Sequence, residues 1–240
     1  MPSRYYRAVL LTLPIRDVQP ATPRARIVRL DLDGQPFEYD AGQAVFVGTH
    51  GGARRKPYSI AAAPEDARRD RWLELLVGVE ADGTPGAHLA LDAGVQVDVE
   101  GPVGSFTFPA APDERRFVFI AGGTGIAPLR SMIRHAVLSR LPGRICLLYS
   151  ARTPKDFAYL AELRGMARRG EISLSVTATR EMLPRWRGGH GRIVAAQLSA
   201  LVEHPETLCF VCGPASMVAD VPLMLRELGI DRTRIRLEDW

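Results

Sequence analysis

The second half of the sequence alternates between short apolar runs and longer segments with helical spacing. Five apolar runs occur, and each of the four segments between them repeats apolar residues three and four positions apart. The runs cover residues 116–122, 144–151, 172–180, 207–214 and 234–240. Continuous apolar strands separated by helices are typical of a parallel sheet that is covered on both faces. The pattern therefore predicts a doubly wound α/β domain with a five-stranded parallel sheet over residues 111–240.

The first 110 residues have a different pattern of short, β-branched or alternating runs separated by Gly, Pro and Asp. These runs cover residues 24–32, 43–50, 56–63, 72–80 and 95–102. Many short strands with close spacing favour a small antiparallel barrel or a sandwich. The proline-containing segment 107–116 is the predicted linker, so we expect one domain over residues 1–110 and another over residues 111–240.

Composition narrows the class of protein. The chain has 240 residues, of which 46% are apolar, and no apolar run has the roughly 18 residues of a membrane span. The three cysteines match no metal-binding spacing, and their odd number favours a reducing compartment, so we expect a cytoplasmic protein without a metal site. Residues 1–112 carry 12 basic and 14 acidic side chains, whereas residues 113–240 carry 19 and 13. This excess fits either a solvated basic surface or a polyanionic ligand in the second half, and no nucleic-acid-binding motif is present.

A glycine cluster joins the first strand of the predicted α/β domain to its first helix. Gly122, Gly123 and Gly125 surround Thr124, and Pro128 suits the first turn of the helix that follows. Glycines allow a tight turn and a close approach of a ligand, and the free N–H groups at a helix start attract anions. No Gly-Lys-Ser/Thr follows, so the segment is not a P-loop. It predicts a site for a nucleotide phosphate.

The ends of the following strands indicate which nucleotide binds. Arg152 follows the second strand, Thr179 and Arg180 end the third, and Arg192 comes shortly afterwards. Ligands bind at the carboxyl edge of such sheets, where an acidic residue favours NAD and an arginine favours the 2′-phosphate of NADP. The fourth strand ends in another turn, Cys212, Gly213 and Pro214, with Met217 on the next helix.

Three ordered motifs carry a resemblance to a known family. They are KPYS at 56–59, GGTGIAP at 122–128 and CGPASM at 212–217. In this order, and over essentially the whole chain, the sequence resembles the ferredoxin–NADP reductase superfamily, specifically its compact bacterial flavoprotein reductases. The resemblance implies an N-terminal antiparallel β-barrel that binds FAD and a C-terminal domain that binds NAD(P). We expect NADPH to be the preferred coenzyme, with NADH as the alternative.

The resemblance also assigns flavin-binding residues. Lys56, Pro57, Tyr58 and Ser59 match the family's flavin strand, where the tyrosine lies against the flavin ring and the serine bonds near its N5 atom. The family usually has arginine at the position of Lys56. Because lysine is a point charge rather than a fork, we expect the FAD pyrophosphate to be bound more weakly or in a different arrangement.

A second flavin-phosphate segment of the family corresponds to residues 83–89. It implies that backbone N–H groups of Gly86, Ala87 and His88 bind phosphate, and Gly86 stands where the family usually has serine. Glu238 and Trp240 match a glutamate and an aromatic residue that the family places near the flavin.

The resemblance implies hydride transfer from the nicotinamide to the flavin, followed by release of electrons to a separate acceptor protein. The polar groups expected at the reacting atoms are Ser59, Cys212 and Glu238. Thr124 is expected near the nicotinamide or the pyrophosphate. The residues expected to hold NADP are Gly123, Thr124, Gly125, Arg152, Thr179, Arg180, Arg192, Cys212, Gly213, Pro214 and Met217.

The acceptor is not specified by the sequence. A ferredoxin or a flavodoxin is the first expectation, since no iron–sulfur cysteine set is present in the chain. The alternatives are an electron-transfer component of an oxygenase or of a larger complex, reduction of ferric iron or free flavin, and a non-catalytic nucleotide-binding sensor with the same fold.

Overall fold

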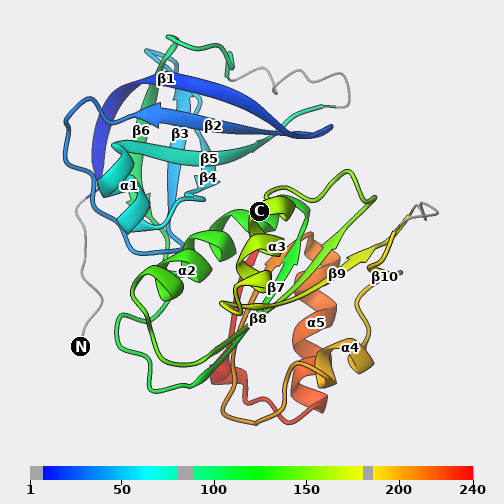
Figure 1. Cartoon of the computed structure of the whole chain (residues 1–240). Coiled ribbons are helices and arrows are strands. Elements are labelled where there is room, and N and C mark those ends of the chain that lie inside the picture. Colours follow the sequence, from blue (N-terminus) through cyan, green and yellow to red (C-terminus); the bar gives the residue numbers. More distant parts are fainter. Residues whose placement is uncertain (1–7, 81–88, 181–185, 240) are drawn as a thin grey trace. The chain divides into compact units, whose positions relative to one another are not determined.

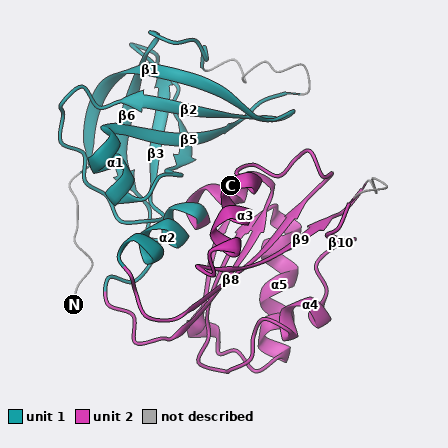
Figure 2. Cartoon of the chain, viewed as in Figure 1, with its two compact units in different colours: residues 1–110, 130–139 teal, residues 111–129, 140–240 magenta. Residues whose placement is uncertain are grey.

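The computed structural model describes residues 8–80, 89–180 and 186–239. The chain forms two compact units (Figure 2). Unit 1 comprises residues 1–110 and 130–139, and unit 2 comprises residues 111–129 and 140–240. That residues 1–110 and 111–240 are two domains stays a prediction. No helix within the described residues is long and apolar enough to cross a lipid bilayer.

Unit 1 is built on a six-stranded antiparallel sheet that is curled into a nearly closed barrel (Figure 1). Its strands are β1 (Val9–Thr22), β2 (Ala25–Asp31), β3 (Ala44–Thr49), β4 (Lys56–Ser59), β5 (Trp72–Gly78) and β6 (Gln96–Val103). Their order is β4-β3-β6-β1-β2-β5. A single bridge between Ile60 and Leu75 brings the two end strands together. The predicted antiparallel barrel is therefore confirmed.

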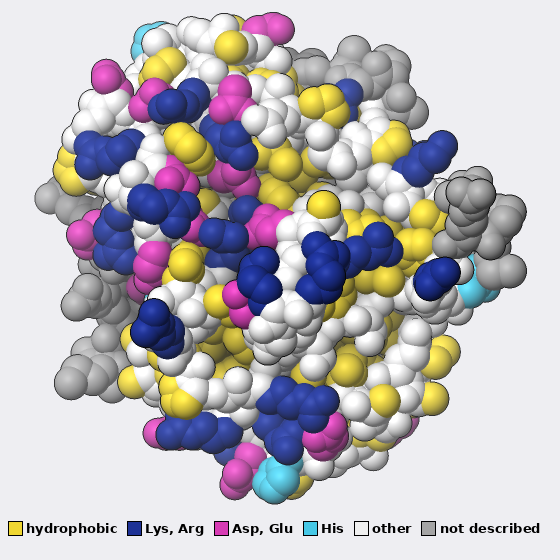
Figure 3. Space-filling view, viewed as in Figure 1, with side chains coloured by type: hydrophobic (Ala, Val, Ile, Leu, Met, Phe, Trp, Pro, Cys, Tyr) yellow, Lys and Arg dark blue, Asp and Glu magenta, His cyan; other side chains and the backbone are white. Residues whose placement is uncertain are grey.

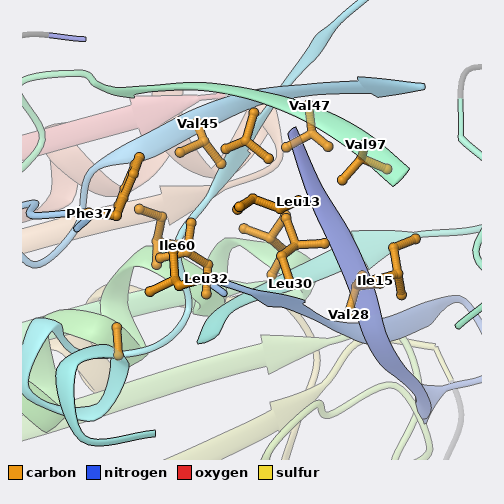
Figure 4. Packing of buried hydrophobic residues seen from close by; sticks show 14 of the residues in the cluster. Leu13, Ile15, Val28, Leu30, Leu32, Phe37, Val45, Val47, Ile60 and Val97 are labelled. Atoms are coloured by element: carbon orange, nitrogen blue, oxygen red, sulfur yellow. The ribbon is translucent and has the colours of Figure 1, made fainter. Parts of the chain in front are cut away.

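The interior of the barrel is filled by the inward-facing residues of these strands (Figure 4). Leu13, Val45 and Ile60 come from three different strands or their ends, and none exposes any surface. The longest strand, β1, was not among the predicted runs, because Pro14 and Pro20 interrupt its pattern. Irregularities in its register with β2 accommodate the interruption.

Ion pairs and hydrogen bonds of charged side chains hold two helices in place within unit 1. Helix α1 (Pro64–Asp70) precedes β5, and α2 (Ile126–Leu138) belongs to unit 1 from Arg130 onward. Arg130 donates to Glu74 at 2.9 Å and to the carbonyl of Ala61 at 2.7 Å. Arg134 binds both carboxylate oxygens of Asp66. Helix α1 was also missing from the predicted elements, since its ion-pair partners lie about seventy positions along the chain.

Unit 2 contains a parallel sheet with the order β10-β9-β8-β7-β11-β12. Its strands are β7 (Arg116–Gly122), β8 (Arg144–Ala151), β9 (Ser173–Ala178), β10 (Gly189–His190), β11 (Leu208–Gly213) and β12 (Ile235–Asp239). Its helices are η1 (Gly123–Gly125), the first turn of α2, α3 (Leu160–Arg168), α4 (Ala195–Ser199), α5 (Ala215–Glu227) and η2 (Arg232–Arg234). The five predicted strands are present, and β10 adds a two-residue edge strand.

Helices cover both faces of this sheet. Residues of α4 and α5 pack in one cluster with Val118, Leu148 and Val211, whereas α3 contributes Leu163 and Met166 to the core on the opposite face (Figure 1). The doubly wound α/β fold is confirmed. In the predicted helical segment between the third and fourth strands of the sequence pattern, the helix α4 has only five residues.

Candidate nucleotide and flavin sites

Two glycine turns of unit 2 lie backbone against backbone at the carboxyl ends of β7 and β11. A Cβ atom added at Gly125 would lie 2.4 Å from the carbonyl oxygen of Cys212. One added at Gly122 would lie 2.6 Å from the ring of Pro214, and one at Gly213 would lie 3.0 Å from the backbone of Gly122. A side chain at Gly125 would therefore force the two turns apart.

The remaining glycine of the first turn differs from its neighbours. Gly123 has φ of +56°, which L side chains rarely adopt, and a Cβ there would meet no atom within 4 Å. Thr124 is exposed beside it, and the turn leads directly into α2. The strand end thus presents open space and helix-start N–H groups, which fits a nucleotide phosphate.

Tyr149 supports this turn and was missed by the sequence analysis. Its hydroxyl donates to the carbonyl of Gly123 at 3.0 Å and accepts from the N–H of Ala158 at 3.2 Å. Burial raises the pKa of Tyr149 well above its ordinary value, so the hydroxyl keeps the proton that it donates. The only sequence signal was an aromatic residue near the end of a predicted strand.

The three predicted arginines follow three neighbouring strands. Arg152 follows β8, Arg180 follows β9 and Arg192 follows β10. The N–H of Arg180 donates to the carbonyl of Arg152 at 2.9 Å. The chain before Arg192 is fixed because the N–H of Gly191 donates to the carbonyl of Ala178 at 2.9 Å. All three side chains are exposed at one edge of the sheet.

Thr179 lies in the same edge, where its N–H donates to the carbonyl of Ala151 at 2.9 Å. Cys212 and Glu238 are register partners on β11 and β12, which places them side by side in the sheet. Cys212 is buried, and Glu238 is half-buried. Met217 lies in the first turn of α5, where its N–H donates to the carbonyl of Pro214 at 2.8 Å.

The predicted flavin strand is β4 in unit 1. Its register with β3 pairs Tyr58 with Val45 and Lys56 with Val47, so Lys56 and Tyr58 share one face. Tyr58 is half-buried, and burial raises its pKa to about 12, so the phenol stays neutral. Ser59 is buried on the opposite face, and Pro57 is half-buried.

The neighbouring Arg55 does not take the place of the arginine that the family usually has where this chain has Lys56. Its side chain passes over Gly48, where an added Cβ would lie 3.0 Å from it. It forms ion pairs with Asp98 at 3.6 Å and with Glu100 at 3.5 Å. Lys56 is therefore the basic residue on the face of Tyr58.

These residues fit the expected cofactors. A half-buried neutral phenol beside a lysine suits a flat ring with a phosphate tail, and the two glycine turns with three arginines suit a dinucleotide with an additional phosphate. Gly86, Ala87, His88 and Trp240 lie outside the described residues.

Comparisons with known proteins identify the family of the chain. Residues 119–222 match the oxidoreductase NAD-binding domain family. The chain is 32% identical to ferredoxin–NADP reductase B of Sorangium cellulosum over 93% of this chain and 94% of that protein. It is 33% identical to methane monooxygenase component C of Methylosinus trichosporium over 70% of this chain and 46% of that protein.

A solved structure shows the same fold. It is a ferredoxin NADP⁺ reductase from Neisseria gonorrhoeae, which superposes with a TM-score of 0.77 at 20% identity and covers 96% of this chain and 98% of that one. The chain therefore belongs to the ferredoxin–NADP reductase superfamily and is an NAD(P)H-dependent flavoprotein oxidoreductase.

Proposed function

We propose that this protein is an FAD-dependent reductase that takes a hydride from NADPH and delivers electrons to a separate acceptor protein such as a ferredoxin or a flavodoxin. The bound flavin supplies the chemistry, since it accepts two electrons together and releases them singly. The residues of the chain bind the cofactors, orient them and exclude water.

The observation that carries the NADPH preference is the set of arginines at the edge of the sheet. Arg152, Arg180 and Arg192 follow three adjacent strands, a backbone hydrogen bond joins Arg180 to Arg152, and Gly191 beside Arg192 is bonded to Ala178. Convergent guanidinium groups suit a phosphate monoester, which NADPH carries on its 2′-oxygen and NADH lacks. No acidic residue that would favour NADH occurs among these described strand-end positions.

We assign the flavin to β4. Tyr58 packs its ring against the isoalloxazine system, Lys56 neutralises phosphate charge, and Ser59 hydrogen-bonds near N5. The neutral phenol of Tyr58 avoids placing a negative charge beside an electron-rich reduced ring. Because lysine binds phosphate through one point charge, we expect Lys56→Arg to tighten FAD binding.

We assign the nicotinamide to the two glycine turns, with Thr124, Gly213, Pro214 and Met217 bordering it. Cys212 and Glu238 are neighbours across two strands, which supports their acting at one place. Their proposed roles are to orient the ring and to hold a proton, and neither is a covalent nucleophile.

The test of the coenzyme assignment is a kinetic comparison of three single variants, Arg152→Ala, Arg180→Ala and Arg192→Ala. Removing one charge-assisted contact to the 2′-phosphate should raise KM for NADPH about tenfold. KM for NADH should change less than twofold. Equal changes for both coenzymes would show that the arginines do not contact the 2′-phosphate.

A second candidate is the reductase component of an oxygenase. It is favoured by the 33% identity to a component of methane monooxygenase. The two functions differ in the acceptor, so stopped-flow reoxidation of the NADPH-reduced protein by a ferredoxin, a flavodoxin and an isolated oxygenase component separates them. The acceptor that reoxidises the flavin fastest at equal concentration identifies the function.

A further inference from the structure

A groove on unit 2 lies between α3 and β9, and none of its described lining residues belongs to the glycine turns. One wall is a single stripe of α3 formed by Leu160, Arg164, Ala167 and Arg168. The other wall includes Leu174 and Val176, which lie two apart on one face of β9. The groove has a volume of about 800 Å³.

Trp186 borders this groove and is held firmly. Its ring stacks on Phe157 with centroids 5.3 Å apart and planes inclined by 18°. Its indole N–H donates to the carbonyl of Gly189 at 2.9 Å. The half-buried indole adds an apolar surface to a floor that is otherwise made of aliphatic side chains.

The charges of the groove are one-sided. Arg164, Arg168 and Arg187 line it, and its described lining residues include no carboxylate. Arg164 and Arg168 are four residues apart on the helix, a spacing at which like charges repel each other and destabilise the helix. In the space-filling view, basic side chains surround an apolar area over α3 and β9 (Figure 3). An anionic occupant would relieve this repulsion.

The dimensions of the groove favour an extended segment. From Leu160 to Arg168 the helical wall is roughly 12 Å long. An extended chain covers that distance with about four residues. A groove with a helix as one wall and a strand as the other suits a linear segment with an apolar side chain toward the floor and acidic side chains toward the arginines.

We propose that this groove docks an extended acidic segment of a partner protein, in which acidic and apolar side chains alternate. The proposal goes beyond the reductase function and requires no contact with the flavin or the nucleotide. Its chemistry is that of a tether, which holds a partner near the enzyme through a short linear motif.

The test uses the complete protein and a fluorescein-labelled hexapeptide that alternates glutamate and leucine. We compare wild type with Arg164→Glu/Arg168→Glu, and with the control Arg24→Glu/Arg140→Glu, which reverses the same number of exposed charges outside the groove. Fluorescence anisotropy should show binding to wild type, about tenfold weaker binding to the groove variant, and less than twofold change in the control. A control hexapeptide that alternates lysine and leucine should not bind.

Several outcomes overturn the proposal. Equal weakening by both double variants would mean that the peptide responds to net charge alone. Displacement of the peptide by NADPH would place the groove in the nucleotide site. A change of the groove variant from dimer to monomer in analytical ultracentrifugation would identify a second copy as the occupant. KM for NADPH is measured on the same variants and should remain within twofold of the wild-type value. Loss of peptide binding can then be distinguished from failure of the proposed reductase function.

Discussion

The two units differ in how deeply the carboxylates of their ion pairs are buried. In unit 1 the carboxylates of Glu74, Asp66 and Asp98 are 6%, 7% and 9% exposed, and each binds at least two partners. In unit 2 the ion-paired carboxylates of Glu203, Glu171 and Glu114 are 40%, 28% and 20% exposed. Breaking a buried pair leaves an uncompensated charge, whereas water replaces an exposed partner. Unit 1 should therefore be sensitive to loss of charge, and unit 2 to loss of close backbone packing at its glycine turns.

The largest effect is expected for Glu74→Gln in unit 1. Glu74 accepts from Arg29 at 2.8 Å and from Arg130 at 2.9 Å, and the substitution leaves both guanidinium groups without its charge. The free energy of unfolding should fall by about 3–5 kcal/mol. Urea denaturation at neutral pH measures it, and a loss below about 1 kcal/mol would remove the contrast between the units.

Gly125→Ala should give the next largest effect, and it acts in unit 2. The new Cβ would lie 2.4 Å from the carbonyl oxygen of Cys212, which belongs to a backbone with little freedom to move. Overpacking costs about 1–3 kcal/mol, and because this Cβ would clash with backbone atoms we expect the upper end of that range, about 3 kcal/mol. Thermal unfolding of the purified protein provides the measurement.

Gly123→Ala is the matched control for Gly125→Ala. Its Cβ meets no neighbour, so only the positive φ opposes it, at a cost of about 1–2 kcal/mol. If the two alanine variants are equally stable, close packing of the turns does not limit the stability of unit 2.

Asp98→Asn should change the pH dependence of stability. The hydrogen bond from His50, at 2.8 Å, and those from Thr12 and the N–H of Gly51 lower the pKa of Asp98 to about 2. Its stabilising contribution is complete above pH 4 and disappears as the pH falls through 2, because the unfolded carboxyl then binds its proton first. Urea midpoints of the variant should therefore fall less steeply than those of wild type between pH 4 and pH 2.

The control for this prediction is Asp92→Asn. Asp92 is exposed and has no ion-pair partner among the described residues. Its acid dependence should match that of wild type. Parallel pH profiles for Asp98→Asn and wild type would mean that the buried carboxylate does not contribute to acid stability.

The smallest effect is expected for Glu203→Gln in unit 2. Glu203 binds Arg116 and Arg144, the latter at 2.7 Å, but all three side chains are more than a third exposed. Water and salt can replace the lost contacts, so the urea midpoint should stay within the scatter of replicate measurements. A loss comparable to that of Glu74→Gln would contradict the distinction drawn between the two units.

Features set by neighbours in the sequence were predictable. The strands of unit 2 and the glycine turn at 122–125 follow from local apolar periodicity and turn chemistry. Features that depend on distant partners were not: β1 needs its bulged pairing with β2, and α1 is attached by Arg134, far along the chain. The direction of the Arg55 side chain could be determined only from the register of the strands and from its ion pair with Asp98.

The same distinction applies to the candidate site. Arg152 and Arg180 were identified because strand ends meet at one edge of a parallel sheet. Tyr149 was missed because its role depends on a hydrogen bond to a carbonyl 26 positions earlier.

The most direct test of the reductase function is an anaerobic titration of the purified protein with NADPH, followed by its visible absorbance. We expect a yellow protein with one FAD per chain, whose flavin absorbance is bleached by one equivalent of NADPH and more slowly by NADH. A colourless protein, or one that binds NADPH without oxidising it, would contradict the proposed function.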